Sequence, residues 1–322
     1  MKKIIYISLL FLLAGCHPSP ELSLTIHECA PIPKGHVCTT CFVVGDQAYF
    51  FAGRDSAGRS LNDLWRYTPA TDTWDNLGAT PLTKRVNATA CVCGDSVYIG
   101  LGFLGSYFND SSYMRDWWQY VPATNQWTRL ASYPNNYTDR ATSFRGDGEL
   151  YVGYGFSWQY RRDMFRYSIA ENRWDSIDVG VGFHGYPARS FGGTGCTCQH
   201  RHFMGTGYYG NSLNWWAEFM PEGRWVARTA VPGRTRTLAA SAATDKYIWL
   251  CGGMHYGGVN TNGEVLQDIY RYNPETDQWT FAAVMPQRLL NHVMFTVGNR
   301  VYFGLGETQD WEANNKLYYF EE

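Results

Sequence analysis

A repeat of about 50 residues runs through the chain and constrains its fold more than any other feature. In each copy a strand-like run ends at a glycine, and an aromatic residue stands four places before that glycine. The glycines are Gly53, Gly102, Gly155, Gly207, Gly253 and Gly306, and the aromatics are Tyr49, Tyr98, Tyr151, Phe203, Trp249 and Tyr302. Six copies of one unit predict an architecture in which each copy packs against its neighbours.

Each copy has the pattern of four antiparallel strands. A turn such as Gly94-Asp95 joins the first strand to the second, which ends at the repeat glycine. A third strand follows the pattern Asp63–Tyr67, and a further turn leads to a fourth strand with a tryptophan such as Trp74. One such sheet cannot bury both of its faces alone. We therefore expect six sheets arranged radially, as the blades of an all-β propeller.

The glycine after the second strand, the tyrosine of the third and the tryptophan of the fourth resemble the kelch repeat. This resemblance covers nearly all of the chain after residue 21 and implies a six-bladed β-propeller with four-stranded antiparallel blades. The chain departs from the family pattern in detail, because only Gly252-Gly253 keeps the paired glycines. Four other copies have Gly-x-Gly instead, as at Gly100-Leu-Gly102.

The sixth copy ends after its third strand, which would leave the ring with an open edge. Counting back from Pro33 places Ile26 where a fourth-strand tryptophan would stand. We therefore expect residues 22–30 to pair with Leu317–Glu321 and close the last blade. The propeller domain would then span residues 22–322.

The first 15 residues have the pattern of an export signal. Two lysines precede the apolar run Ile4–Leu13, which is too short to span a bilayer. The run leads into Ala14-Gly15-Cys16, which resembles the bacterial lipoprotein signal, and an ordinary signal peptide is the alternative. The resemblance implies cleavage before Cys16, lipid attachment there, and a tether over residues 16–21. We expect a cell-envelope protein held by its lipid anchor alone, at the outer membrane because no aspartate follows Cys16.

Basic residues recur where the first strand of each copy begins. A four-stranded meander places these starts, and the loops after the second strands, at the same end of the propeller. We expect a positive ring around that mouth of the central channel, suited to binding carboxylate. The alternative is that these side chains bond the carbonyls of neighbouring loops. The residues are His36, Arg85, Arg140, Arg189, Arg236 and Arg288.

The loops after the second strands are rich in aromatic residues. Exposed aromatic rings beside polar groups suit stacking on sugars or on peptide side chains. The alternative is that they pack over the blades. The candidate binding residues are Tyr107, Trp158, Tyr208, Tyr256 and Trp311.

Of nine cysteines, eight follow Cys16, and two Cys-x-Cys pairs stand among them. Alignment of the copies places Cys91 and Cys196 at apolar positions of the first strand, so buried thiols are expected there. The two pairs belong to the second and fourth copies, which are not neighbours, and this argues against a four-cysteine zinc site. Disulfides are chemically allowed in the envelope, although no pairing can be assigned. We predict no metal and no cofactor.

A formal net charge of −2 and the lack of a polybasic stretch argue against a nucleic-acid partner. The sequence has no nucleophile elbow, His-Glu-x-x-His motif or phosphate loop. The leading hypothesis is a monomeric, non-enzymatic module that binds a glycan or a protein. The alternative follows from a resemblance to bacterial sialic acid mutarotases, which implies an isomerase of acidic sugars in which Glu307 moves protons. Galactose oxidases are also of kelch type, but their copper ligands have no matching positions here.

Overall fold

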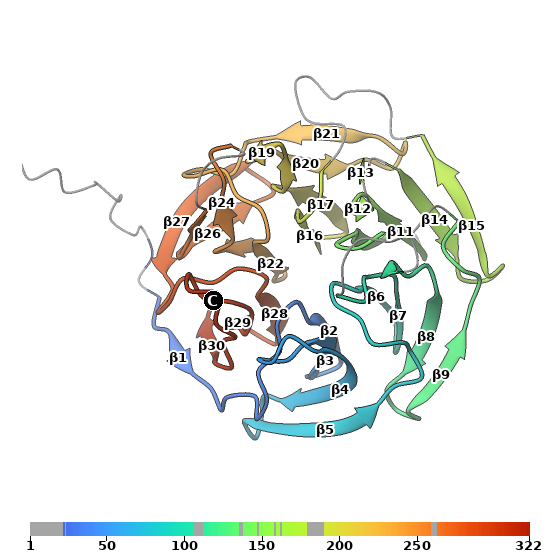
Figure 1. Ribbon diagram of the computed structural model, residues 1–322. Coiled ribbons are helices and arrows are strands. Elements are labelled where there is room, and N and C mark those ends of the chain that lie inside the picture. The colour runs from blue at the N-terminus through green and yellow to red at the C-terminus, as the bar shows by residue number, and fades with distance from the viewer. Residues whose placement is uncertain are drawn as a thin grey trace, which may run out of the picture.

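The computed structural model describes residues 22, 24–105, 112–134, 138–146, 148–157, 159–161, 163–178, 190–258 and 263–322. They form a β-propeller of six four-stranded antiparallel sheets around a central axis (Figure 1). The predicted fold class, an all-β propeller with six blades, is confirmed. Within these ranges no helix is long and apolar enough to cross a membrane.

The first five blades are meanders that run outward from the axis in chain order (Figure 1). Blade 1 is β2 (Thr40–Val44), β3 (Gln47–Arg54), β4 (Ser60–Thr68) and β5 (Thr73–Ala79); blade 2 is β6 (Thr89–Cys93), β7 (Ser96–Gly100), β8 (Trp117–Val121) and β9 (Gln126–Arg129). Blade 3 is β10 (Thr142–Gly146), β11 (Glu149–Gly153), β14 (Met164–Ser168) and β15 (Arg173–Ile177); blade 4 is β16 (Thr194–Cys198), β17 (Arg201–Gly205), β20 (Trp216–Phe219) and β21 (Trp225–Arg228). Blade 5 is β22 (Ala240–Ala243), β23 (Ile248–Cys251), β26 (Asp268–Asn273) and β27 (Gln278–Val284).

Short two-stranded ribbons follow the second strand in three of these blades. They are β12 (Phe156–Ser157) with β13 (Gln159–Tyr160), β18 (Tyr208–Tyr209) with β19 (Asn211–Ser212), and β24 (Met254–His255) with β25 (Glu264–Val265). The ribbons lie at the end of the propeller where the first strands begin, because isolated bridges join the two segments in each blade, as between Phe191 and Tyr208. The expectation that these two sets of loops share one end is confirmed.

Blade 6 takes its outer strand from the other end of the chain. Its strands are β28 (Val293–Val297), β29 (Arg300–Gly304), β30 (Leu317–Glu321) and β1 (His27–Glu28). In the antiparallel pair β1–β30, His27 lies opposite Tyr319 and Glu28 opposite Tyr318 (Figure 1). The predicted closure of the ring by the N-terminal segment is confirmed.

The repeat aromatics fill the seams between blades. Tyr302 of blade 6 stacks on Phe295 with ring centroids 4.9 Å apart, and it meets the edge of Tyr67 in blade 1 at 6.0 Å. Both tyrosines belong to one buried cluster that spans the two blades. Burial of each such ring stabilises the fold by roughly 2 kcal/mol or more. The seams therefore account for the aromatic content of the chain.

In blades 1, 3 and 5 a polar clasp also holds the outer strand region of the preceding blade. In blade 1 the Asp72 carboxylate accepts hydrogen bonds from the Tyr67 hydroxyl (2.7 Å) and from the backbone N–H of Ala30 (2.9 and 3.0 Å). The Trp74 indole donates to the Ala30 carbonyl at 2.8 Å. The same clasp recurs at Tyr167, Asn172, Trp174 and Ala131, and at Tyr272, Asp277, Trp279 and Thr229. The tyrosine and the tryptophan of the repeat thus hold the preceding blade.

A ring of residues with positive φ surrounds the axis just before the first strands. We call it the inner ring: Cys38, Asn87, Arg140, Gly192, Leu238 and Asn291, with φ between 50° and 63°. Backbone N–H groups donate to the preceding member, from Asn87 to Cys38 at 3.0 Å and from Leu238 to Gly192 at 2.7 Å. The inner ring therefore fixes the backbone of six blades in one equivalent conformation while its side chains differ.

Candidate functional site

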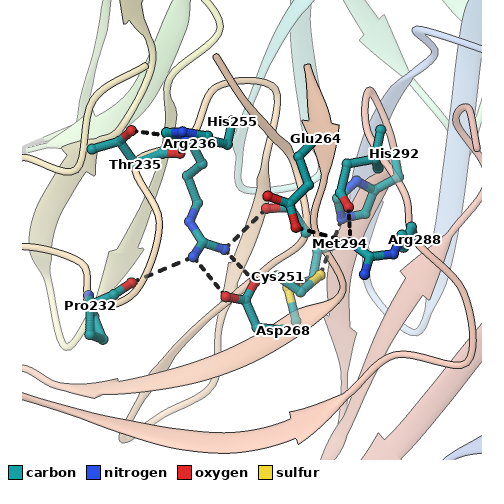
Figure 2. A network of polar contacts seen from close by, with 12 residues as sticks. Pro232, Thr235, Arg236, Cys251, His255, Glu264, Asp268, Arg288, His292 and Met294 are labelled. Atoms are coloured by element: carbon teal, nitrogen blue, oxygen red, sulfur yellow. Dashed lines mark hydrogen bonds and ion pairs between the residues drawn. The ribbon is translucent and has the colours of Figure 1, made fainter. Parts of the chain in front are cut away.

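Two of the predicted ligand contacts are structural residues. The Arg85 guanidinium is fully buried and donates to both carboxylate oxygens of Asp116, at 2.7 and 2.9 Å, and to the Leu101 carbonyl. Arg236 is buried in the same way and pairs with Asp268 at 2.6 and 2.9 Å (Figure 2). The prediction that these arginines face a ligand is corrected, because both side chains are fully buried and paired with a carboxylate inside their own blades.

The other basic candidates fall in different environments. His36 occupies the same place in blade 1 as Arg85 in blade 2; it is fully buried, and its Nε2 lies 3.4 Å from Asp63. Arg288 donates to the Val265 carbonyl at 2.6 Å and lies 3.5 Å from Glu264. His36, Arg85 and Arg236 are all buried, so these three predicted members do not expose positive charge at the mouth of the channel.

Several predicted residues cannot be placed. Cys16, Tyr107, Trp158 and Arg189 lie outside the described residues. Tyr208 and Tyr256 lie edge to face, with centroids 5.7 Å apart, and Trp311 is 57% exposed. The two tyrosines thus form a small aromatic surface on neighbouring blades at the predicted end of the propeller.

Beside this surface Glu307 lies in a polar contact that joins blades 6 and 1. Its carboxylate accepts a hydrogen bond from the Asn291 amide at 2.8 Å and another from the Arg54 guanidinium at 3.3 Å. Glu307 is buried, and Asn291 belongs to the inner ring. The candidate proton-transfer residue of the sequence analysis is therefore held close to the axis.

A second buried carboxylate, Asp139, lies on blade 3 and joins it to blade 2. One of its oxygens accepts hydrogen bonds from the Arg140 guanidinium at 2.7 Å and from the Asn87 amide at 3.2 Å. Burial raises the pKa of Asp139, although Arg140 and Asn87 oppose this shift. The protonated form of Asp139 is thus favoured over a wider pH range than in water.

The charges of both carboxylates, Glu307 and Asp139, act on Cys38, and that of Glu307 also acts on Tyr256. Burial raises the pKa of the Cys38 thiol to about 12, and the charges of Arg140, Glu307, Arg54 and Asp139 act on it as well. Burial also raises the pKa of Tyr256, with smaller effects from Tyr208, Arg140 and Glu307. We call this group the axial cluster and define it as Arg54, Asn87, Asp139, Arg140, Asn291 and Glu307.

Sequence reasoning found Glu307 and Arg140 but missed the other four members. Arg54 directly follows a repeat glycine, and Glu307 stands at the same place in blade 6, where four other copies have an apolar or aromatic residue. The charged residues Arg54 and Glu307 at this place could therefore have indicated a polar site from the sequence alone. Asn87 and Asn291 were not visible as a pair, because their common role depends on the positive φ of the inner ring.

Surface cavities also lie at the opposite end of the propeller from the axial cluster. A cavity of about 570 Å³ lies at the turns between first and second strands, with Arg145, His200 and His202 in its lining. Among the described residues that line this cavity, there are basic side chains but no carboxylate. We favour the axial cluster as the functional site because it combines acidic, basic and amide groups with a neighbouring aromatic surface.

The eight cysteines after Cys16 are unpaired in the described part of the chain, and most are buried. Burial raises the thiol pKa of Cys91, to about 12, and that of Cys198, to about 11. Such thiols are poor nucleophiles. Across the described ranges, no three His, Cys, Asp or Glu side chains gather as a metal-binding group.

Family models match the repeats described above. A model of the KLHDC2/KLHL20/DRC7 kelch-repeats domain matches residues 21–207, and the kelch motif model matches residues 235–286. The chain belongs to the kelch-repeat family. This kelch propeller has the tyrosine and tryptophan clasp in blades 1, 3 and 5, so the family residues have a structural role in those blades.

Curated relatives of this kelch protein include sugar epimerases. N-acetylneuraminate epimerases from Escherichia coli (strain K12) and Shigella sonnei (strain Ss046) are each 29% identical over 121 residues, and N-acetylneuraminate epimerase 2 from Escherichia coli O6:H1 is 30% identical over 121 residues. The match covers 37% of this chain and about a third (32%) of the relatives' length. A solved structure titled "Structure of YjhT" superposes with a TM-score of 0.73 at 16% identity, over 90% of this chain and 96% of that one. That superposition supports the propeller fold.

Proposed function

We propose that the axial cluster of this kelch propeller binds a carboxylated sugar and accelerates the interconversion of its anomers. The observation that carries this proposal is the placement of two buried carboxylates, Glu307 and Asp139, near the axis, each held by a guanidinium and an amide. Carboxylates in such settings are suited to moving protons on and off oxygen.

Anomer interconversion needs little more than proton transfer. A base takes the proton of the anomeric hydroxyl, the bond between the anomeric carbon and the ring oxygen breaks, and the ring oxygen accepts a proton. Rotation of the open-chain form and the reverse steps then give the other anomer. Glu307 is the candidate base, and Asp139, whose pKa is raised by burial, is the candidate acid.

Recognition of the acidic sugar is assigned to the basic members of the cluster. The Arg140 side chain is 27% exposed and that of Arg54 is 35% exposed, so each can contact a ligand while keeping its carboxylate partner. Tyr208 and Tyr256 offer aromatic faces for the sugar ring. The curated relatives are named N-acetylneuraminate epimerases, which makes N-acetylneuraminate the first substrate to test.

The test is the approach to anomeric equilibrium of freshly dissolved N-acetylneuraminate, followed by NMR with purified protein. We expect a faster approach than in buffer, and a loss of about 100-fold or more in the catalysed rate for Glu307→Gln. Glu312→Gln is the matched control, because Glu312 is exposed and lies on the same loop. Equal rates with and without the wild-type protein would overturn the proposal.

The second candidate is a binding module without chemistry. The exposed Trp311 and the Tyr208–Tyr256 pair favour it, because such aromatic surfaces recognise glycans and protein loops. Binding of N-acetylneuraminate that Arg140→Met weakens, together with no acceleration of anomer exchange, would select this function over the first.

We also propose that the chain is anchored in the bacterial cell envelope through lipid on Cys16, at the outer membrane. The support is the sequence pattern Leu13-Ala-Gly-Cys16. Labelled palmitate should enter the wild-type chain in cells and should not enter Cys16→Ala. Equal labelling of the two would contradict the anchor.

A further inference from the structure

Three soft or borderline metal-donor atoms meet between blades 5 and 6. The Cys251 sulfur lies 3.2 Å from Nε2 of His292 and 3.8 Å from the sulfur of Met294 (Figure 2). Cys251 ends β23, whereas His292 directly precedes β28 and Met294 is the second residue of that strand. All three side chains are buried. Two neighbouring blades thus bring a thiol, an imidazole and a thioether to one point.

These separations are close to those of donors that share one transition-metal ion. In a tetrahedral arrangement, bonds of about 2.3 Å to sulfur and about 2.0 Å to nitrogen hold sulfur and nitrogen about 3.5 Å apart and two sulfurs about 3.8 Å apart. The S–S distance of 3.8 Å agrees with this value, and the S–N distance of 3.2 Å is shorter by about 0.3 Å. An ion could therefore bind with little movement of the backbone.

The sixfold repeat shows that this point is built differently from its counterparts. His292 stands where the other blades have small residues, at Thr39, Ala88, Ala141, Gly193 and Ala239. Gly252, with φ +55°, stands where they carry a side chain at positive φ, at Ala52, Leu101, Tyr154, Thr206 and Leu305. A Cβ on Gly252 would lie 2.8 Å from the His292 ring and 2.8 Å from the Met285 methyl group. The missing side chain therefore makes room for the imidazole.

The His292 imidazole is buried beside Cys251, with its Nε2 3.2 Å from the sulfur. Its Nδ1 has no hydrogen-bond partner among the described residues, so the hydrogen-bonding environment of the ring is incomplete at this position. A buried histidine with a purely structural role normally satisfies both nitrogens, because each unsatisfied group costs about 1–3 kcal/mol. The side-chain contact of this ring is therefore the one between Nε2 and the Cys251 sulfur.

We propose that Cys251, His292 and Met294 form a copper(I) site. Thiolate, thioether and imidazole together are the donors that copper(I) prefers. As the bond between copper and sulfur forms, the thiol proton leaves to solvent, and the resulting thiolate neutralises the single charge of the ion. A divalent ion on the same ligands would leave an unbalanced charge in an apolar core, which is strongly unfavourable. The proposal does not depend on the chemistry of the axial cluster.

The test is a copper(I) titration of the reduced, full-length protein without oxygen, in competition with the coloured chelator bicinchoninate. We expect one copper(I) per chain to be withheld from the chelator at this site. Cys251→Ser should abolish that retention, and Met294→Leu should weaken it about tenfold or more. X-ray absorption of the loaded protein should show two sulfur donors and one nitrogen donor.

Cys198→Ser is the matched control, because Cys198 is another buried thiol of an inner strand and lies in blade 4. It should keep the copper that Cys251→Ser loses. Thermal unfolding without metal checks that each variant folds, and Met294→Leu, which conserves volume, carries the test if Cys251→Ser does not fold. Retention that both Cys251→Ser and Met294→Leu leave unchanged, or no retention by the wild type, would overturn the site.

Discussion

The Arg85 guanidinium and the Asp116 carboxylate form a two-point ion pair inside blade 2, with N–O distances of 2.7 and 2.9 Å. Burial opposes ionisation of Asp116, but Arg85 holds the pKa of that carboxyl below its usual range. Arg236 and Asp268 repeat this pair in blade 5 (Figure 2). These arginines, which the sequence predicted to contact a ligand, therefore tie the segment before the first strand of each blade to the start of its third strand.

Removal of Arg85 should destabilise the propeller strongly. Arg85→Met leaves the Asp116 charge without its partner, and we expect the free energy of unfolding to fall by about 3–5 kcal/mol. Urea denaturation followed by tryptophan fluorescence measures it. Arg66→Met is the control, because the Arg66–Asp75 pair is partly exposed and should contribute only about 0–1 kcal/mol. Similar losses in the two variants would contradict a special role for the buried pair.

Loss of Asp72 should open the ring at its closing strand. Asp72→Ala removes the acceptor of both the Ala30 N–H and the Tyr67 hydroxyl, and we expect a loss of about 1–3 kcal/mol. Hydrogen exchange should rise selectively at β1. Asp277→Ala is the control, because it breaks the same clasp at Thr229, which is not at the end of the ring. Faster exchange at β1 in the control variant as well would contradict a local effect.

Two buried carboxylates should respond to pH with opposite sign. The pKa of Asp139 is raised by burial, so its ionised form costs stability once the pH rises from about 3.9 through the higher folded pKa. Burial opposes ionisation of Glu218 too, but Arg201 and Arg228 hold its pKa below the usual range. Glu218 therefore contributes stability at neutral pH that is lost as the pH falls through its folded pKa.

The corresponding amide variants test this sign. At pH 7, Asp139→Asn should unfold at a higher urea concentration than the wild type, and Glu218→Gln at a lower one. The difference for Asp139→Asn should shrink near pH 3, where the wild-type Asp139 carboxyl is protonated. The difference for Glu218→Gln should shrink only as the pH falls through the lowered folded pKa of Glu218. A destabilised Asp139→Asn at pH 7 would show that ionised Asp139 supports the fold.

Gly252 should be intolerant of a side chain. In Gly252→Ala the new Cβ meets the Leu289 carbonyl at 2.6 Å and the His292 ring at 2.8 Å, and φ is +55°, so we expect a loss of roughly 1–3 kcal/mol or more. Thermal unfolding of the metal-free protein measures it. Ala52→Gly, at the equivalent place of blade 1, removes rather than adds a methyl group and should change stability much less. Equal effects would show that the space beside His292 is not needed.

Much of the fold could be predicted because its determinants are periodic. The glycine, the aromatic four places before it, and the tyrosine and tryptophan of the outer strands recur at nearly constant spacing. Even the closure by the N-terminal segment followed from counting, and His27–Glu28 pair with β30 as expected. Such features depend on local spacing and on burial, both of which a single sequence displays.

The site was less predictable because it depends on register and on partners distant in the chain. The spacing indicated that Arg140 lies two or three places later than Arg85, but it did not show that this offset places Arg140 on the inner ring at positive φ. Glu307 contacts Arg54 at a separation of 253 residues, because the ring brings the first and last blades together. Linear spacing carries no information about this second contact.

In the inner ring the backbone joins neighbouring blades, whereas the side chains differ from blade to blade. Its backbone is nearly the same at Cys38, Gly192 and Leu238, although these residues share no chemistry. Exchange of one side chain there changes what the axis presents without disturbing the hydrogen bonds that carry the circle. New ligand preferences can therefore arise in this architecture by single substitutions, with little demand for compensating change elsewhere.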